Sequence, residues 1–261
     1  MLAFFLVPVA AIFTRVSLGT MLHELSSDVV QDALRVTLKT NLVALVFVLL
    51  VGTPTAYLIA TRSFRGRALV LTAIELPLVL PPAVAGIGLL ATFGRLGLLG
   101  STLDFLGWRV GVGTQAAVVL AVAFVAGPFY VRPAVAAFEA VDPTLLGAAR
   151  TLGAGPARTF FRIALPLAAG GLGAGAALAF ARGIGEFGAT LMFAGSLQGV
   201  TQTLSLAIYQ EFDVDFDSAL AISGLLVVFS AVLLLSVKVI VGWRSTYASL
   251  IPFGRSTSIS S

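Results

Sequence analysis

The chain has 261 residues, of which 58% are hydrophobic and 11% are charged. Soluble domains contain about 45–50% apolar and about 25% charged residues, so this composition excludes an ordinary soluble domain and indicates a protein surrounded by lipid. The net charge is +4, but the 16 basic residues are spread along the chain, and we expect no nucleic-acid partner.

Six apolar runs are long enough to cross a bilayer, which takes about 20 mostly apolar residues per helix. They predict an all-α membrane protein with a single transmembrane domain over 1–261 and no second domain. The first run lacks a basic stretch before it, and its nearby Arg15 comes late, so we expect a retained helix rather than a cleaved signal peptide. The predicted spans are 2–22, 35–60, 68–93, 114–137, 165–192 and 218–241.

Charge alternates between the connecting segments. The segments 61–67 and 138–164 and the tail after 237 hold nine basic residues: Arg62, Arg65, Arg67, Arg150, Arg158, Arg162, Lys238, Arg244 and Arg255. The other segments hold eight acids: Glu24, Asp28, Asp32, Asp104, Glu211, Asp213, Asp215 and Asp217. Because Lys and Arg accumulate on the cytoplasmic side, the pattern predicts a multi-pass protein of the plasma or inner membrane with both termini cytoplasmic.

The segment 138–164 is the longest of the basic segments. Asp142 is placed to cap a helix, with Pro143 at its first position. One apolar face is expected on this helix, formed by residues at helical spacing: Leu145, Leu146, Ala149 and Leu152.

A second short helix is expected after the Gly153–Pro156 turn, with Pro166 where the next span begins. The spacing places Phe160, Phe161 and Ile163 on one side of it, and Arg158 and Arg162 on another. Each helix is about 15 Å long, too short to span a bilayer. Such a pair can lie on the membrane surface with its arginines on lipid phosphates, or it can dock a cytoplasmic partner.

The same segment resembles a loop found in membrane subunits of binding-protein-dependent ABC importers, which follows the pattern E-A-A-x3-G-x9-I-x-L-P. Ala148, Ala149 and Gly153 match it, as do Ile163 and the Leu165–Pro166 pair, while Gly147 stands in place of the glutamate. The resemblance implies that residues 139–166 form the helices that dock into a separate ATPase subunit and couple it to the spans. The implied coupling residues are Glu139, Ala148, Ala149, Gly153, Arg158, Phe160, Phe161, Ile163 and Pro166.

Three further stretches resemble the permease subunit of molybdate importers, with tungstate and sulfate/thiosulfate permeases close by. They are "LPLVLPPAVAGIGLL" at 76–90, "RGIGEFGAT" at 182–190 and "TQTLSLAIY" at 201–209. The resemblance implies a homodimer with the path at its interface, and an extracellular or periplasmic binding protein that delivers the oxyanion. Molybdate, tungstate and sulfate are tetrahedral dianions of similar shape, so the sequence does not choose among them.

The chain itself is not expected to be an enzyme or to bind a cofactor. It has only Lys39 and Lys238 as lysines, and neither lies in a P-loop, so ATP and Mg²⁺ belong to the partner ATPase. The "GIGEFG" run at 183–188 matches a dinucleotide fingerprint but lies in a predicted membrane helix, where small residues allow close packing. With no cysteine and His23 as the single histidine, no metal site is expected.

Ionisable residues and prolines inside the predicted spans are candidates for the translocation path or its gate. Arg182 and Glu186 lie four apart on one expected helical face. They can form an internal ion pair, which avoids a costly unpaired arginine, or Arg182 can meet an oxyanion. Glu75 can line the path or pair with Arg132, and Pro81–Pro82 mark either a hinge or a static kink.

Two alternatives remain open at this stage. The outer acids Asp213, Asp215 and Asp217 form either a plain solvated loop or a contact for the delivering protein. A self-contained channel or secondary transporter is the alternative function class. The loop motif argues against it, as does the shortage of buried acids and histidines for a proton relay.

Overall fold

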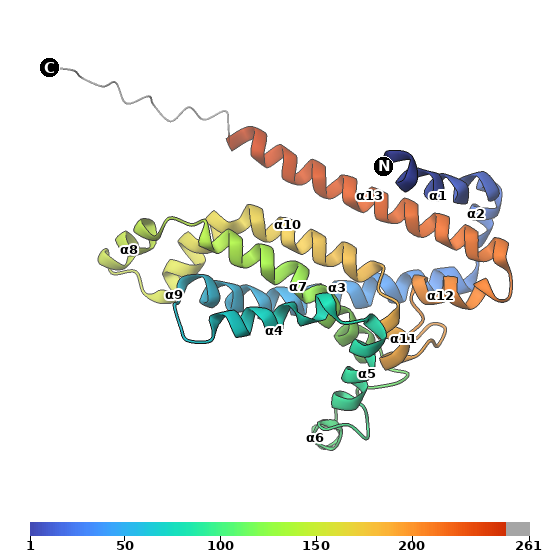
Figure 1. Cartoon of the computed structure of the whole chain (residues 1–261), viewed down its shortest axis with the longest axis horizontal. Helices are drawn as coiled ribbons and strands as arrows, with labels where there is room; N and C mark the ends of the chain where they lie inside the picture. Colours follow the sequence, from blue (N-terminus) through green and yellow to red (C-terminus); the bar gives the residue numbers. More distant parts are fainter. Residues whose placement is uncertain (249–261) are drawn as a thin grey trace.

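The computed structural model describes the backbone of residues 1–248, and within that range the chain is helical with no strand (Figure 1). A π-helical turn, η1, spans Phe160–Ala164. The helices are α1 (Leu2–Arg15), α2 (Leu18–Leu25), α3 (Asp28–Thr61), α4 (Arg67–Val79), α5 (Pro82–Phe93), α6 (Gly100–Phe105), α7 (Gln115–Glu139), α8 (Pro143–Thr151), α9 (Pro156–Thr159), α10 (Leu165–Ile184), α11 (Gly188–Ala194), α12 (Leu204–Phe212) and α13 (Phe216–Ala248).

Four long helices, α3, α7, α10 and α13, form the body of the molecule, and α5 and α6 extend to one side of it (Figure 1). Helix α7 lies at the centre and packs on both α3 and α10. Glycines allow this close packing, since a Cβ at Gly52 would lie 3.0 Å from the Tyr130 ring, and one at Gly171 2.5 Å from the Ala137 Cβ. The buried Tyr130 hydroxyl lies 2.5 Å from Thr53 Oγ1 and thereby links α7 to α3.

Four stretches of the described chain are long and apolar enough to cross a membrane: 28–61, 115–139, 156–184 and 216–233. Two bent pairs can supply one more span each, α1 with α2 at 84° and α4 with α5 at 115°. Helix α3 starts seven residues before the predicted span, because Ser27 caps it by accepting a hydrogen bond from the Val30 amide.

The fifth predicted span, 165–192, differs from the structure at both ends. The helix continues back through η1 to Pro156, so the expectation of a separate second loop helix was wrong. Pro166 lies inside this continuous helix and has no amide to donate, and the preceding turn widens so that the Leu165 amide bonds to the Phe160 carbonyl. At the other end α10 stops at Ile184, and α11 is a separate helix.

Candidate functional site

The segment between α7 and α10 begins with a capped short helix. Asp142 Oδ1 accepts a hydrogen bond of 2.8 Å from the Thr144 amide, and Pro143 occupies the first position of α8. This bond from the Thr144 amide, together with one from the Thr144 side chain, holds the pKa of the exposed Asp142 carboxyl below its ordinary value, because both stabilise the charged form. The sequence thus determines the start of α8 locally.

The turn after α8 explains the glycine of the loop pattern. Gly153 has φ +82°, in the left-handed region that disfavours side chains. Its amide bonds to the Arg150 carbonyl and the Ala154 amide to the Ala149 carbonyl, which together satisfy the end of α8 in a Schellman motif. Pro156 then starts α9 with its φ already set for a helix.

Aromatic packing ties the loop to the body of the molecule. Phe160 makes an edge-to-face contact with Tyr57 of α3 at 4.8 Å between ring centroids, and lies 6.2 Å from Phe138 of α7. Thr159 is fully buried beside it, and Ile163 packs on the same apolar core. Any displacement of this part of the loop is therefore felt by α3 and α7.

The expected apolar faces of the loop divide into a buried and an exposed set. Leu146 and Ala149 are buried, whereas Leu145 is 47% and Leu152 88% exposed. Phe161 is 63% exposed and does not share a side with Phe160 and Ile163, so that expectation was wrong: the π-helical turn changes the angle between successive side chains.

The remaining coupling candidates lie on the outside of the loop. Ala148, Arg158 and Pro166 are exposed, and so is the neighbouring Arg162. Gly147, at the position of the missing glutamate, is also exposed, and a Cβ there would meet nothing within 4 Å. The loop therefore presents an apolar surface fringed by arginines.

Glu139, the last residue of α7, forms an ion pair with Arg67, the first residue of α4. Arg67 Nε also donates a hydrogen bond of 3.1 Å to the Ile59 carbonyl near the end of α3. One arginine thus joins three helix ends directly beside the loop.

Glu75 pairs with Arg132 of α7, at 3.0 Å between the carboxylate and Nε. The side chains are 31% and 58% exposed, although both lie well inside apolar helices. Exposed charges are costly in hydrocarbon, so this face of α4 and α7 is not expected to meet lipid tails.

The first helix break lies between α4 and α5, where Leu80 and Pro81 are extended and Pro82 starts the new helix. Neither proline can donate a backbone hydrogen bond, so the α-helical ladder ends there and the chain bends by 115°. The bend is too sharp to be a mild kink in one straight span.

The second break lies between α10 and α11 and contains a buried ion pair. Glu186 lies beyond the end of α10 at Gly185, so Arg182 and Glu186 do not share one helical face as expected. They still meet, with Arg182 Nη2 2.9 Å from Glu186 Oε2, a contact whose angle is poor for a hydrogen bond. Glu186 Oε1 accepts a 2.9 Å bond from the Ala189 amide and so caps α11.

The two breaks come together because α5 packs against α11. A Cβ at Gly86 of α5 would lie 2.6 Å from the Ala189 carbonyl, and a Cβ at Gly188 of α11 2.8 Å from the Pro82 Cβ. We call this contact between α5 and α11 the seam. Of the pathway candidates, Pro82 and Glu186 lie on or beside the seam, whereas Glu75 belongs to the contact between α4 and α7.

A buried polar segment beside the second break was missed by sequence reasoning, which treated 196–217 as an outer connection. Thr201, Gln202 and Thr203 are buried before α12. The Leu204 amide donates 2.9 Å to Thr37 Oγ1 of α3, which fixes α12 to that helix. Leu204, Ala207 and Ile208, which lie at i, i+3 and i+4 and pack in one apolar cluster, were a signal in the sequence that could have revealed α12.

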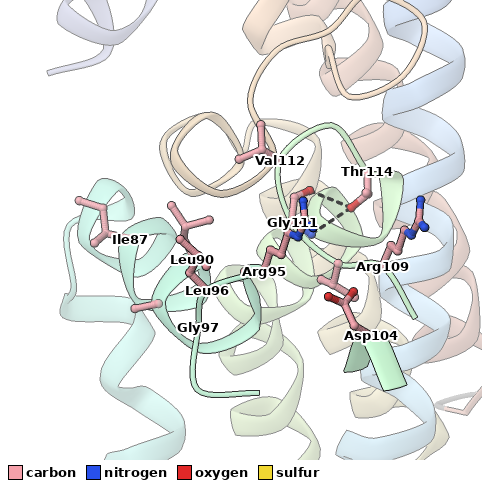
Figure 2. A pocket seen from close by; sticks show the side chains of 13 residues that line it. Ile87, Leu90, Arg95, Leu96, Gly97, Asp104, Arg109, Gly111, Val112 and Thr114 are labelled. Carbon is pink, nitrogen blue, oxygen red and sulfur yellow. Dashed lines mark hydrogen bonds between the residues drawn. The ribbon is translucent and has the colours of Figure 1, made fainter. Parts of the chain in front are cut away.

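An open cavity of about 1010 Å³ lies beside α5 and α6 (Figure 2). Arg95, Asp104 and Arg109 line it together with apolar side chains, and the Gly111 amide and carbonyl both bond to Thr114 Oγ1 at its wall. Within residues 1–248, no group of three or more His, Asp or Glu side chains could hold a metal ion.

Comparison with known proteins agrees with this arrangement. A family model described as "Binding-protein-dependent transport system inner membrane component" matches residues 52–244. The molybdenum transport system permease protein ModB of Mycobacterium bovis is 43% identical over 236 residues, which is 90% of this chain and 89% of that protein.

Solved structures show the same fold at low identity. A chain of a bacterial alginate ABC transporter, solved with an alginate-bound periplasmic protein, has a TM-score of 0.67 at 17% identity and covers 96% of this chain and 90% of its own. A chain of the inward-facing MetNI methionine ABC transporter has a TM-score of 0.62 at 19% identity and covers 82% and 94%.

Proposed function

Because the chain belongs to the family of inner membrane components of binding-protein-dependent transport systems, we propose that it forms the path for a tetrahedral oxyanion in an ATP-driven importer. It is a multi-pass membrane protein of the inner membrane. The substrate proposed is molybdate or tungstate, because the ModB relatives that cover most of the chain are molybdenum transport permeases. Sulfate or thiosulfate is the alternative.

The proposed topology has six spans in one domain, with both termini cytoplasmic. Four continuous spans and two bent pairs are compatible with that number. The loop between α7 and α10 carries Arg150, Arg158 and Arg162, which favours its cytoplasmic placement.

The path is proposed to run along the face of α4, α5 and α7, at the contact between two copies of the chain. The half-exposed Glu75–Arg132 pair carries this argument, since two partly exposed charges at membrane depth are stabilised by water or protein rather than by lipid. The seam of α5 and α11 is a suitable gate, because two helix breaks meet there.

The loop at 139–166 is proposed to dock into the ATPase subunit, which binds the ATP and Mg²⁺. The observation that carries this proposal is the pattern of exposure: Leu145, Leu152 and Phe161 face outward, while Phe160 is packed on α3 and α7. An exposed apolar surface suits a protein partner. Phe160 then passes movement of the docked surface to the spans, and the chain alone is expected to hydrolyse no ATP.

A separate binding protein is proposed to deliver the anion at the opposite end. The connection that includes Glu211, Asp213 and Asp215 is acidic and would not attract a free dianion. Capture by a soluble protein that then docks avoids this repulsion.

The docking proposal is tested by placing a charge on the exposed surface. The variant Leu152→Glu should abolish co-purification with the ATPase subunit, because a carboxylate would be buried in an apolar contact. Leu197→Glu, 52% exposed and remote from the loop, is the matched control. Normal ATPase binding by Leu152→Glu and by a deletion of 147–163 would contradict the proposal, and anion uptake without any ATPase would favour a channel.

A further inference from the structure

Two ion pairs of opposite polarity join α4 to α7. Arg67 of α4 meets Glu139 of α7, and Glu75 of α4 meets Arg132 of α7. The charges are eight residues apart on α4 and seven apart on α7, which is about two helical turns on each. Since the start of α4 meets the end of α7, the helices are antiparallel, and the pairs form two successive rungs between them.

Few side-chain contacts set the position of α4 along α7, although its C-terminal end is joined through Leu80–Pro81 to α5, which packs on α11. None of the residues of α4 is buried, and Leu69 and Val79 are 74% and 83% exposed. Leu71 and Ile74 are only partly buried against the core. Apolar contacts of this kind are not directional and tolerate sliding. The rungs and the Arg67–Ile59 hydrogen bond therefore supply the directional contacts of α4.

The opposite polarity of the rungs selects one register. If α4 moved by one rung toward its own C-terminal end, Arg67 would come to the level of Arg132, and like charges would face each other. If α4 moved by one rung toward its own N-terminal end, Glu75 would face Glu139. Both neighbouring registers are thus penalised by repulsion, whereas two rungs of the same polarity would have permitted the slide.

We infer that this ladder fixes the register of α4 on α7 and carries movement of the ATPase-docking loop to the break at Pro81–Pro82. Glu139 lies at the point where α7 enters the loop, and α4 runs from Arg67 directly to the break. The four charged side chains act as positioning residues. The inference that they transmit movement rests on the proposed transport function, but the register itself does not.

The register can be measured without transport. The chain has no cysteine, so spin labels at Leu69→Cys on α4 and Leu42→Cys on α3 report the position of α4 along the bundle. In R67E/E75R both rungs face like charges, and a slide by one rung makes an attractive pair again, so the label distance should change by up to about 12 Å. The fourfold exchange R67E/E75R/R132E/E139R should restore the original distance. An unchanged distance in R67E/E75R would overturn the register claim.

Transmission is tested in proteoliposomes with the ATPase and the binding protein, as molybdate transported per ATP hydrolysed. R67E should lower this ratio roughly tenfold, a size typical of coupling between sites, while ATPase activity remains. The double variant R67E/E139R should recover the ratio. The control R65E, which replaces an exposed arginine two residues away, should leave the ratio unchanged. A normal ratio in R67E, or no recovery in R67E/E139R, would overturn transmission. If the wild type moves no anion, the proposed function fails while the register result stands.

Discussion

The α8–α9 turn and the α10–α11 break are both made at glycine, yet different contacts hold them. At Gly153 the structure is local: Asp142 caps one end of α8, a Schellman motif closes the other, and Pro156 starts the next helix. At Gly185 the adjacent Glu186 contributes a buried ion pair, but the break also depends on distant elements: α11 packs on α5, and Ser205 of α12 donates a hydrogen bond to the Ile184 carbonyl.

This difference determines where the structure tolerates movement. A locally stabilised loop can shift as a unit on its aromatic anchor without losing its own hydrogen bonds. A change in the angle between α10 and α11 at Gly185 would separate the buried Glu186 from Arg182 or from the Ala189 amide, which is costly. The largest effects of substitution on stability are therefore expected at the break and the smallest in the loop.

The largest effect is expected for Glu186→Leu. It leaves Arg182 without its partner and removes the cap of α11. Removal of one member of a buried pair costs about 3–5 kcal/mol, and we expect the low end because Arg182 keeps 28% of its side chain exposed. Thermal unfolding in detergent measures the loss. The double variant Arg182→Leu/Glu186→Leu should regain most of it, and equal instability of the two would show that the pair does not stabilise the break.

A somewhat smaller effect is expected for Gly86→Val at the seam between α5 and α11. The new Cβ would lie 2.6 Å from the Ala189 carbonyl and 2.7 Å from the Met192 Cβ, so the two helices must separate. Overpacking of this kind costs about 1–3 kcal/mol. Gly88→Val on the same helix is the control, since its Cβ would meet nothing within 4 Å. Similar unfolding temperatures for both variants would show that α5 and α11 are not closely packed.

In the loop, Gly153→Ala should destabilise α8 by about 1–2 kcal/mol, because alanine is strained in the left-handed region. The matched control is Gly147→Ala, which lies inside α8 and should stabilise it by about 0.5–1 kcal/mol. Hydrogen exchange of the α8 amides compares the two variants. The same change of protection in both would mean that the Schellman turn does not form.

The smallest effect is a pH dependence of the α8 cap. Since the pKa of Asp142 is lowered from 3.8, the cap contributes fully above that value and is lost as the pH falls through the lower pKa of the folded loop. Exchange of the Thr144 amide, corrected for its intrinsic rate, should lose protection only in that acidic range. Asp142→Asn keeps a capping oxygen without the titration, so its protection should not change with pH.

The local features could be predicted from the sequence. The capping by Asp142, the turn at Gly153 and the helix start at Pro156 depend on neighbours within a few residues. The position of α7 could also be predicted, because a long apolar run marks it in the sequence. The Glu75–Arg132 pair was predicted as one of two possibilities, and the structure contains it.

The tertiary features could not be predicted. The extent of the 115° bend and the position of Glu186 beyond α10 depend on packing between segments distant in sequence, and the exposure of Phe161 depends on a π-helical turn that the helical spacing does not indicate. The polarity of the two rungs is visible in the sequence only after α4 and α7 are known to be antiparallel neighbours.

The most direct test of the account is uptake of radioactive molybdate into proteoliposomes that hold this chain with its ATPase, with the binding protein outside. We predict uptake that requires ATP and the binding protein and that is lost with Leu152→Glu. Uptake that proceeds equally without ATP, or that is unaffected by Leu152→Glu, would contradict the claim that the loop at 139–166 couples ATP hydrolysis to the membrane path.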